Sequence, residues 1–350
     1  MTSAPKRQTM PEQIPVGVIG VGTMGSHHAR AYSELPRADL VGVADEDETR
    51  AQSVATEHST RVLDHSRVID RAAAVSIAVP THAHAEIARE AIDAGVDVLI
   101  EKPFVREPAV GRDLIERAHE QDVVLQIGHI ERFNPAIQTL MDILVDLDVI
   151  AIDARRLGPP IDRETDRSVA YDLMIHDIDI LLALLRSEPS SISAVGCHDN
   201  RHVTTTLQFD DGIVGTVTAS RLTQQKVREC WITAKDCLVI VDYIEQSVRI
   251  HRHSLPEYVQ SANGVRYRHE SITERPTVEN GEPLKAELSS FLDSVADRSQ
   301  PAVTGVDGLR AVEMVRQIDA LATDPDAGMT SDAGLQRPID TSSSDFTGGM

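Results

Sequence analysis

The residues between positions 20 and 25 form the first group whose types and spacing could do chemistry. The run Gly-Val-Gly-Thr-Met-Gly follows a β-branched stretch and opens a helical pattern. In a G-x-G-x-x-G turn of this kind, the first glycine permits a tight turn, the second lets a pyrophosphate approach the backbone, and the third allows close helix–strand packing. N–H groups at the start of the helix would bind the phosphates. We therefore expect five residues to hold a dinucleotide: Gly20, Gly22, Thr23, Met24 and Gly25.

An acidic residue follows this turn at the spacing that dinucleotide sites use. Asp45 lies about 20 positions beyond the last glycine, where its carboxylate would accept hydrogen bonds from an adenosine ribose. Glu46 and Asp47 add negative charge where a 2′-phosphate would lie, and no arginine nearby takes their place. The sequence therefore favours NAD over NADP as the cofactor.

A lysine ends a later buried strand, in the sequence Glu-Lys-Pro at 101–103. The carboxyl ends of the strands in an open α/β sheet form the edge that holds ligands. Lys102 is one of only five lysines in the chain, so its place before a turn-fixing proline indicates a required ammonium group, with a surface lysine as the alternative. Besides Lys102, we expect four residues at this edge to contact the cofactor: Pro80, Thr81, His84 and Glu101.

A carboxylate and an imidazole lie four residues apart on a later helical pattern. Asp172 and His176 would therefore share one face of a helix. The carboxylate can orient the ring and raise its basicity, and histidine titrates near neutral pH, so the pair could act as a general base. A buried histidine that is satisfied by a helix carboxylate remains the alternative.

Two further groups of polar residues could bind a substrate. Four of them directly follow the last strand of the expected parallel sheet: His129, Glu131, Arg132 and Asn134. Three more are arginines, concentrated in an otherwise acidic chain: Arg155, Arg156 and Arg163. The planar guanidinium fork suits a diphosphate. The alternatives are a solvated loop with Asn134 as a helix cap, and arginines that pair with the acidic residues around them.

The order of β-branched and amphipathic stretches predicts the elements that position these residues. Up to residue 145, strands and helices alternate, which is typical of βαβ units and a parallel sheet. The expected strands there are 16–20, 39–44, 74–79, 97–100 and 123–127, with a weaker one at 61–63. After a helix at 169–185, closely spaced runs predict a mostly antiparallel sheet: 192–197, 203–209, 213–220, 229–234, 238–242 and 247–251. Helices at 284–297 and 307–322 close the fold.

In combination, the glycine turn, Glu-Lys-Pro and Asp-x-x-x-His resemble the Gfo/Idh/MocA family of NAD(P)-dependent oxidoreductases. The likeness spans about residues 14 to 322 and includes Val-Thr-Gly-Val-Asp-Gly-Leu-Arg at 303–310. The resemblance implies oxidation of a ring hydroxyl of a sugar or cyclitol, with no metal. It also implies catalytic roles for three residues: Lys102, Asp172 and His176. Lys102 would hydrogen-bond the hydroxyl, and His176, paired with Asp172, would take its proton.

The resemblance also implies an α/β fold with two main domains. A Rossmann domain with a doubly wound parallel sheet would precede an α/β domain with a large, mostly antiparallel open sheet, which would join subunits in a homodimer or homotetramer. We expect a flexible leader at 1–13, a Rossmann domain at 14–128 and a substrate-binding and oligomerisation domain at 129–282. C-terminal helices at 283–323 would pack back between the domains, and a disordered tail would follow at 324–350.

Two segments are similar to one branch of this family. They are Gly-His-Ile-Glu-Arg-Phe-Asn-Pro at 128–135 and Arg-Arg-Leu-Gly-Pro-Pro at 155–160. That branch oxidises UDP-N-acetylglucosamine at its 3-hydroxyl to a 3-keto sugar, so the likeness implies a UDP-sugar substrate. A free-sugar or inositol dehydrogenase is the alternative, and a non-enzymatic NAD-binding sensor is a third.

Composition and charge exclude several other classes of protein. The net charge of −21 and an aromatic content of 3% argue against a nucleic-acid binder. No apolar run approaches the roughly 20 residues of a membrane span, and the first residues lack the apolar core of a secretion signal, so we expect a cytoplasmic protein. Three widely spaced cysteines cannot form a zinc ribbon or a disulfide framework.

The 55 acidic residues are spread along the whole chain, a balance that is typical of adaptation to high salt. An ordinary acidic protein is the alternative. At molar ionic strength the Debye length is about 3 Å, so a dense carboxylate surface suffers little self-repulsion. We expect the melting temperature, measured by circular dichroism, to rise between about 0.1 and about 1 M KCl. Loss of the fold at high salt, with full stability in dilute buffer, would contradict this expectation.

Overall fold

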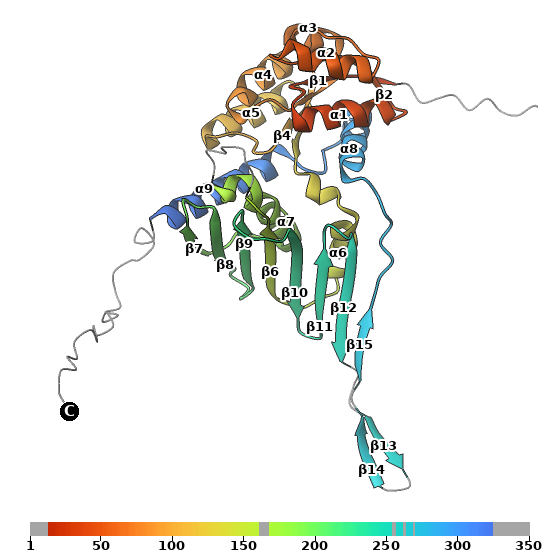
Figure 1. Ribbon diagram of the computed structural model, residues 1–350, viewed down its shortest axis with the longest axis vertical. Helices are drawn as coiled ribbons and strands as arrows, with labels where there is room; N and C mark the ends of the chain where they lie inside the picture. Colours follow the sequence, from red (N-terminus) through yellow and green to blue (C-terminus); the bar gives the residue numbers. More distant parts are fainter. Residues whose placement is uncertain (1–12, 161–167, 254–256, 262–263, 269, 325–350) are drawn as a thin grey trace, which may run out of the picture.

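A five-stranded parallel sheet flanked by helices forms the first half of the chain (Figure 1). The computed structural model describes residues 13–160, 168–253, 257–261, 264–268 and 270–324. The strand order is β2-β1-β3-β4-β5, with these bounds: β1 (Ile14–Ile19), β2 (Ala38–Ala44), β3 (Ala74–Ile77), β4 (Asp97–Glu101) and β5 (Leu125–Gly128). Since β2 and β3 lie on opposite sides of β1, the strand order reverses here, which opens a crevice beyond the carboxyl ends of the strands. The predicted parallel Rossmann sheet is confirmed.

The connecting helices follow the predicted pattern with one addition. They are α1 (Thr23–Glu34), α2 (Glu48–Glu57), α3 (His65–Arg71), α4 (Thr81–Asp93) and α5 (Pro108–Glu120). Helix α3 was not predicted, because a helix of only seven residues shows little periodicity. The weak strand expected at 61–63 contributes only an isolated bridge between Val43 and Val62.

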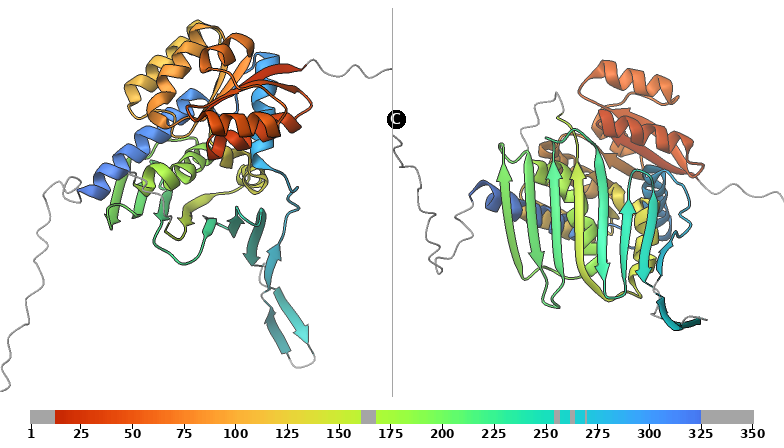
Figure 2. Two further views of the ribbon diagram at one scale, coloured as in Figure 1. Left: turned by 45° about the horizontal axis from the view of Figure 1, so that its top comes forward. Right: turned by 60° about the horizontal axis from the view of Figure 1, so that its bottom comes forward.

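An eight-stranded sheet forms the second half (Figure 2). Its order is β15-β12-β11-β10-β6-β9-β8-β7, with these bounds: β6 (Val149–Leu157), β7 (Ser191–Cys197), β8 (His202–Gln208), β9 (Val214–Ser220), β10 (Val227–Ala234), β11 (Cys237–Asp242), β12 (Ser247–His253) and β15 (Ser271–Glu274). Only the β6–β9 pair is parallel in this sheet. The predicted, mostly antiparallel sheet is therefore confirmed.

Several elements of this half were not predicted. Strand β6 was missed because charged residues interrupt its sequence, and the edge strand β15 and the two-stranded ribbon of β13 (Glu257–Ser261) and β14 (Gly264–Arg268) also went unrecognised. The expected helix 169–185 is divided into a π-helical turn, Ala170–Met174, and α7 (Ile175–Leu185).

Helices cover one face of the large sheet and leave the other face open (Figure 2). The covering helices include α6 (Pro135–Leu144), α7 and α9 (Gly305–Thr323). Strand β6 shows the difference between the two faces, because side chains alternate along a strand. Ile152, Ala154 and Arg156 are buried on the covered face, and Arg155 is exposed on the open one.

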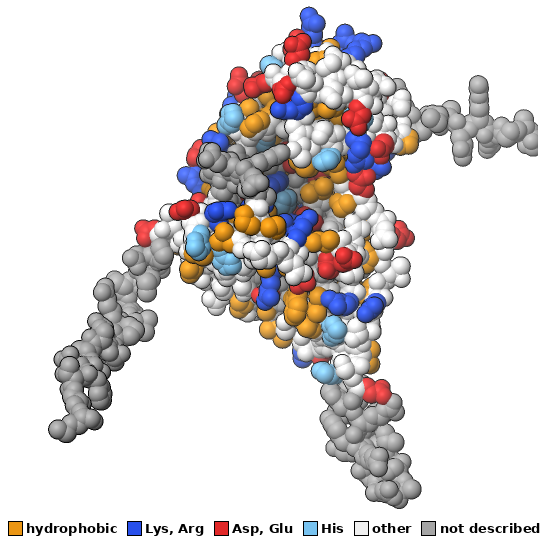
Figure 3. All heavy atoms as spheres, in the orientation of Figure 1, with side chains coloured by type: hydrophobic (Ala, Val, Ile, Leu, Met, Phe, Trp, Pro, Cys, Tyr) orange, Lys and Arg blue, Asp and Glu red, His pale blue; other side chains and the backbone are white. Residues whose placement is uncertain are grey.

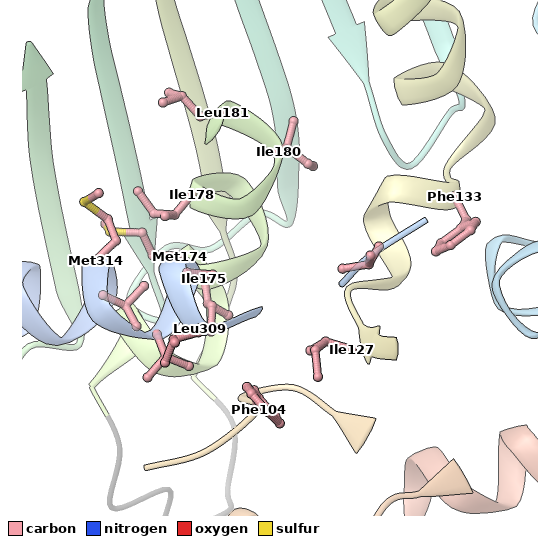
Figure 4. Packing of buried hydrophobic residues seen from close by; sticks show 14 of the residues in the cluster. Phe104, Ile127, Phe133, Met174, Ile175, Ile178, Ile180, Leu181, Leu309 and Met314 are labelled. Atoms are coloured by element: carbon pink, nitrogen blue, oxygen red, sulfur yellow. The ribbon is translucent and has the colours of Figure 1, made fainter. Parts of the chain in front are cut away.

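The C-terminal segment connects the two halves. Helix α8 (Pro283–Asp297) packs against α1 and against the short helix Ile130–Phe133, and α9 packs on α5, α7 and β7. The strand-like segment before α9 joins the edge of the parallel sheet, where Ile127 donates its backbone N–H to the carbonyl of Val303. Figure 4 shows the shared core, in which Phe104 and Leu309 lie near Met174 and Ile175. This core anchors the loop after β4 against the π-helical turn before α7.

Most of the predicted leader and tail, residues 1–12 and 325–350, lies outside the described residues. Among the helices that the structure describes, none has the length and apolar character needed to span a bilayer. Acidic side chains lie over both halves on the face that Figure 3 shows.

Candidate active site

The glycine turn after β1 has the geometry that a dinucleotide requires. Gly20 has a φ of +86°, and a Cβ there would lie 2.6 Å from the backbone nitrogen of Val79. A Cβ on Gly25 would lie 1.7 Å from the carbonyl oxygen of Gly20, so the third glycine allows α1 to begin close to the strand. A Cβ on Gly22 would meet no described atom within 4 Å. The second glycine therefore leaves the backbone open to a pyrophosphate at the start of α1.

A pocket of about 480 Å³ adjoins this turn. Its lining comes from the turn, α1 and α2: Val21, Gly22, Thr23, Ser26, Arg50, Ser53 and Val54. At its side, the Asp45 carboxylate accepts a hydrogen bond of 2.7 Å from the backbone N–H of Val21. Together, the open backbone, the helix N-terminus and the adjacent carboxylate fit the adenosine and pyrophosphate of NAD.

An arginine lies near this carboxylate, although none takes the place of Glu46 or Asp47 in the sequence. Arg50 lines the pocket, and its Nη1 lies 3.2 and 3.4 Å from the two carboxylate oxygens of Asp45. Its Nη2 donates to Asp47 at 3.2 Å. Two carboxylates thus neutralise a guanidinium at the place where a 2′-phosphate would lie.

This arrangement predicts a change of cofactor preference in Asp45→Asn. Asparagine keeps a hydrogen-bond acceptor for the backbone N–H of Val21. It removes the negative charge that would repel a phosphate and that now pairs with Arg50. A hydrogen bond to a charged group is worth about 1.5–3 kcal/mol, so we expect kcat/KM for NADP relative to NAD to rise at least about tenfold. Steady-state rates with both cofactors test this. Adding Arg50→Ala to the variant should abolish the gain, and a wild-type protein that prefers NADP would contradict the prediction.

Lys102 lies at the carboxyl end of β4 and reaches the second half of the chain. Its Nζ donates a hydrogen bond of 2.9 Å to the backbone carbonyl of Asp172 and lies 3.7 Å from Oδ1 of the same residue. Its side chain is 19% exposed. Burial lowers the pKa of this ammonium, and the carboxylates of Asp172 and Glu101 offset part of that effect. The lysine is therefore a partly buried hydrogen-bond donor at the meeting point of the two halves.

His176 lies in the first turn of α7, on the same side of the molecule. The predicted hydrogen bond between Asp172 and His176 is wrong: the Asp172 carboxylate accepts from Nε of Arg221 at 3.0 Å, and His176 Nδ1 has no hydrogen-bond partner in the described structure. The physical reason is the π-helical turn, because side chains four residues apart are not aligned there as they are in an α-helix. Burial, together with the charges of Lys102 and Arg156, lowers the pKa of His176 well below its usual 6.5, so the imidazole is neutral at pH 7.

His129 is a buried imidazole beside this site. Neither of its ring nitrogens hydrogen-bonds to a described group, and its Nδ1 lies 3.9 Å from Oδ2 of Asp179. Burial lowers the pKa of His129, and its charge in turn would lower the pKa of His176. His129 therefore remains a candidate for a substrate contact.

The other polar residues of the 129–134 segment hold the structure together. Arg132 donates two hydrogen bonds of 2.7 Å to Asp179. Asn134 caps α6 through the N–H of Ala136 and donates to the carbonyl of Tyr243. The polar groups of these two side chains are thus engaged within the protein, and their roles as substrate ligands stay predictions.

Neighbouring arginines of β6 lie on opposite faces of the sheet. Arg156 is 3% exposed and donates to both oxygens of Asp177, at 2.6 and 3.0 Å, and to Glu131 at 2.8 Å. Arg155 lies on the open face and pairs with Asp153. Glu131 and Arg156 thus pair with each other, Arg155 lies on the opposite face, and the substrate contacts predicted for these three residues stay predictions. Arg163 lies outside the described residues.

Two predicted cofactor contacts point into the protein instead. The ring nitrogens of His84 lie 2.9 Å from the carbonyl of Val79 and 3.1 Å from that of Phe104, so the imidazole joins the loops after β3 and β4. The Glu101 carboxylate accepts from His28 at 2.9 Å and from the backbone N–H of Lys102 at 3.1 Å. Pro80 and Thr81 begin α4 at the crevice edge, where a cofactor contact stays a prediction.

Behind Glu101 lies a buried carboxyl that the sequence did not reveal. Glu287 of α8 is fully buried, and neither of its carboxyl oxygens has a hydrogen-bond partner in the described structure. Ligand atoms of His28, Glu101 and Glu287 lie within 4.8 Å of one another. The only sign of this buried carboxyl in the sequence is its position, because Glu287 falls where an amphipathic helix buries its side chains.

Glu287 predicts a specific pH dependence of stability. Burial and the nearby charges of Glu101 and Asp179 raise its pKa well above 4.5. The folded protein thus binds the proton of the Glu287 carboxyl more tightly than the unfolded chain does. The contribution of this proton to the free energy of unfolding is complete below the pKa of the unfolded state and declines as the pH rises toward the pKa of the folded state. Glutamine is neutral throughout, so the melting temperature of Glu287→Gln relative to wild type should increase from about pH 5 to about pH 8.

The control for Glu287 is Asp297→Asn, which alters an exposed carboxylate at the end of the same helix. Its melting temperature should differ from wild type by the same amount at both pH values. A divalent metal that copurifies with the wild type and is absent from Glu287→Gln would contradict the neutral carboxyl and indicate a cation site.

Comparisons with known proteins agree with this geometry. The family model "Oxidoreductase family, NAD-binding Rossmann fold" matches residues 14–129, and the model "GFO/IDH/MocA C-terminal domain" matches residues 152–237. UDP-N-acetylglucosamine 3-dehydrogenase from Acidithiobacillus ferrooxidans is 34% identical over 307 residues, which cover 86% of this chain and 95% of that protein. A solved structure of that enzyme superposes with a TM-score of 0.80, covering 88% of this chain and 97% of the other.

Inositol dehydrogenases are also similar. The scyllo-inositol 2-dehydrogenase (NAD(+)) of Bacillus subtilis is 29% identical over 242 residues, which cover 61% of this chain and 68% of that enzyme. The chain belongs to the GFO/IDH/MocA family of oxidoreductases with an NAD-binding Rossmann domain.

Proposed function

We propose that this protein uses NAD to oxidise a ring hydroxyl of a UDP-sugar, with the 3-hydroxyl of UDP-N-acetylglucosamine as the best candidate. The observation that carries the substrate is the likeness to UDP-N-acetylglucosamine 3-dehydrogenase, which extends over 86% of this chain. The inositol dehydrogenases match with lower identity over a similar length, as for the 24% identical Rhizobium meliloti enzyme, or over a shorter part of the chain.

The side chains at the meeting point of the halves supply the acid–base chemistry of such an oxidation. NAD held at the glycine turn would accept the hydride from the ring carbon. The Lys102 ammonium would donate a hydrogen bond to the reacting hydroxyl and stabilise the alkoxide charge that develops there. His176 would take the hydroxyl proton at Nε2, since its Nδ1 is buried. Its neutral state at pH 7 suits this role.

Asp172 has a positioning role in this proposal. Its backbone carbonyl and carboxylate hold the Lys102 ammonium, and Arg221 fixes the carboxylate from the other side. The side chain thus orients the lysine, where the sequence had suggested that it orients the histidine.

A free-sugar or inositol dehydrogenase is the second candidate. It is favoured by the inositol dehydrogenases among the relatives and by the ion pairs within the protein that engage Arg155 and Arg156. Both candidates use the same lysine and histidine.

The test is NADH formation with four substrates offered separately: UDP-N-acetylglucosamine, UDP-N-acetylglucosaminuronate, myo-inositol and glucose. Each should be assayed in dilute buffer and in molar KCl. Turnover of a UDP-sugar alone, lost in Lys102→Ala and His176→Ala and retained in Arg155→Ala, would support the proposal. Turnover of free polyols alone would refute the substrate, and NAD binding without turnover of any of them would favour a sensor.

The open face of the large sheet supports the proposal of a homodimer or homotetramer. Val195 is 66% exposed and Trp231 is 38% exposed, and strand alternation places both on this face with Arg155. Light scattering coupled to gel filtration would measure the mass, and Trp231→Glu should lower it. A monomeric wild type would contradict the proposal.

A further inference from the structure

Four cationic side chains lie where the covered face of the large sheet meets the parallel sheet. They are Lys102, Arg156, Arg221 and Arg228, and Figure 3 shows basic and histidine side chains at the level where the two halves meet. Three of them have carboxylate partners, namely Arg156 with Asp177 and Glu131, and Lys102 and Arg221 with Asp172. The partners of the fourth, Arg228, are backbone carbonyls and not carboxylates.

Arg228 makes hydrogen bonds only to backbone carbonyls within the described structure. Its Nη1 donates to the carbonyl of Leu157 at 2.8 Å and to that of Val227 at 2.9 Å. No carboxylate of the described residues lies within 4.0 Å of its guanidinium, and its Nε and Nη2 are neither hydrogen-bonded nor buried. Two nitrogen atoms of the guanidinium, which carry three N–H groups, therefore remain for a ligand.

The register of the sheet places this guanidinium beside that of Arg156. Arg228 pairs directly with Arg156 across β10 and β6, and it shares the covered face with Cys230 and Ile232. Burial and the charges of Arg156 and Arg221 together lower the pKa of Arg228 to about 10, against the opposing effect of Asp177 and Glu131. The charge of Arg228 also contributes to the lowered pKa of His176, so the two groups share one site.

The guanidinium of Arg228 calls for an anion. Lys102, Arg156 and Arg221 pair with the carboxylates of Asp172, Asp177 and Glu131. Among these four cations, Arg228 alone has no carboxylate partner within the described residues. A neutral polyol would leave the Arg228 guanidinium half-buried and uncompensated, whereas a phosphate oxygen would neutralise it.

We propose that Arg228 binds the diphosphate of a nucleoside-diphosphate sugar and so selects that substrate class over free sugars. The inference rests on the proposed function and assigns to this arginine the recognition that the sequence suggests for Arg155 and Arg156. The guanidinium fork matches two phosphate oxygens at once, so a lysine at this position would replace it only in part.

The test measures binding of UDP to the NAD-loaded protein by titration calorimetry, which requires no turnover. Arg228→Gln should weaken UDP binding about 10- to 100-fold, as expected for the loss of a charge-assisted hydrogen bond, while NAD affinity stays the same. Arg228→Lys should recover part of the loss. Arg155→Gln, on the opposite face of the neighbouring strand, is the matched control and should bind UDP as the wild type does.

Turnover separates the possible failures. If wild type oxidises UDP-N-acetylglucosamine and Arg228→Gln binds UDP equally well, the role of Arg228 is wrong and the proposed function stands. If wild type neither binds UDP nor oxidises a UDP-sugar, the proposed function itself fails. If Arg228→Gln impairs only UDP-N-acetylglucosaminuronate and leaves UDP binding intact, the arginine binds the sugar carboxylate and the diphosphate assignment is overturned.

Discussion

Lys102→Met should lower kcat by about 100- to 1,000-fold, the loss that follows removal of one donor aimed at a developing oxyanion. Methionine retains most of the hydrophobic stem of lysine and removes only the ammonium that stabilises the alkoxide. The affinity for NAD should change little, because the glycine turn and Asp45 supply most of the contacts that we assign to the cofactor. Steady-state rates and calorimetric titration with NAD would measure the two quantities separately.

Lys226→Met is the matched control, since it removes the ammonium of an exposed lysine just before β10. It should retain wild-type rates. If Lys102→Met kept more than about a tenth of the wild-type kcat, the lysine would not stabilise the transition state as proposed.

The pH profile of kcat should distinguish Lys102 from His176. The pKa of His176 lies well below 6.5, so its basic form is complete by neutral pH and oxidation should slow only in acid, as the imidazole becomes protonated. The pKa of Lys102 lies below 10.5, so the rate should also fall on the alkaline side before the usual pKa of lysine is reached. His176→Gln should remove the acid limb, and an unchanged acid limb in that variant would exclude His176 as the base.

Arg156→Met should destabilise the fold by about 3–5 kcal/mol, the cost of leaving a buried carboxylate without its partner. Arg156 holds Asp177 and Glu131 with three hydrogen bonds, and its guanidinium lies 5.5 Å from the centre of the Tyr243 ring. Removing it leaves Asp177, which is 1% exposed, uncompensated in the core. Urea unfolding followed by circular dichroism would give the free energy of unfolding.

The adjacent residue supplies the control for Arg156. Arg155→Met breaks an exposed ion pair with Asp153 and should cost no more than about 1 kcal/mol. Removal of both buried charges in Arg156→Met/Asp177→Leu should recover most of the lost stability, because the desolvated carboxylate is then gone. Equal losses in Arg155→Met and Arg156→Met would contradict the assignment of the two faces.

Local signals in the sequence determined the elements and the placement of the main motifs. The glycine turn, the strand before Lys102 and the capping residue Asn134 could be located because each depends on neighbours in the chain: backbone conformation, apolar periodicity and a short-range hydrogen bond. Strand β6 was missed for the same reason. Its buried Arg156 breaks the apolar pattern, and only a partner 21 residues away makes that burial favourable.

The partners of the polar side chains were decided by the tertiary structure. Asp172 and His176 have helical spacing, yet the π-helical turn and the approach of Lys102 and Arg221 give the carboxylate other partners. Likewise, His84 and Glu101 lie at the predicted sheet edge but turn inward.

The physical reason lies in the long range of these interactions. A charged or polar side chain lies where its desolvation is offset, and the groups that offset it come from strands and helices distant in the chain. The sequence therefore determined the parallel sheet with its glycine turn and the catalytic candidates at its edge. Only the packing of the two halves decided that Arg156 pairs with Asp177 and that Arg228 is left with a guanidinium fork free for a ligand.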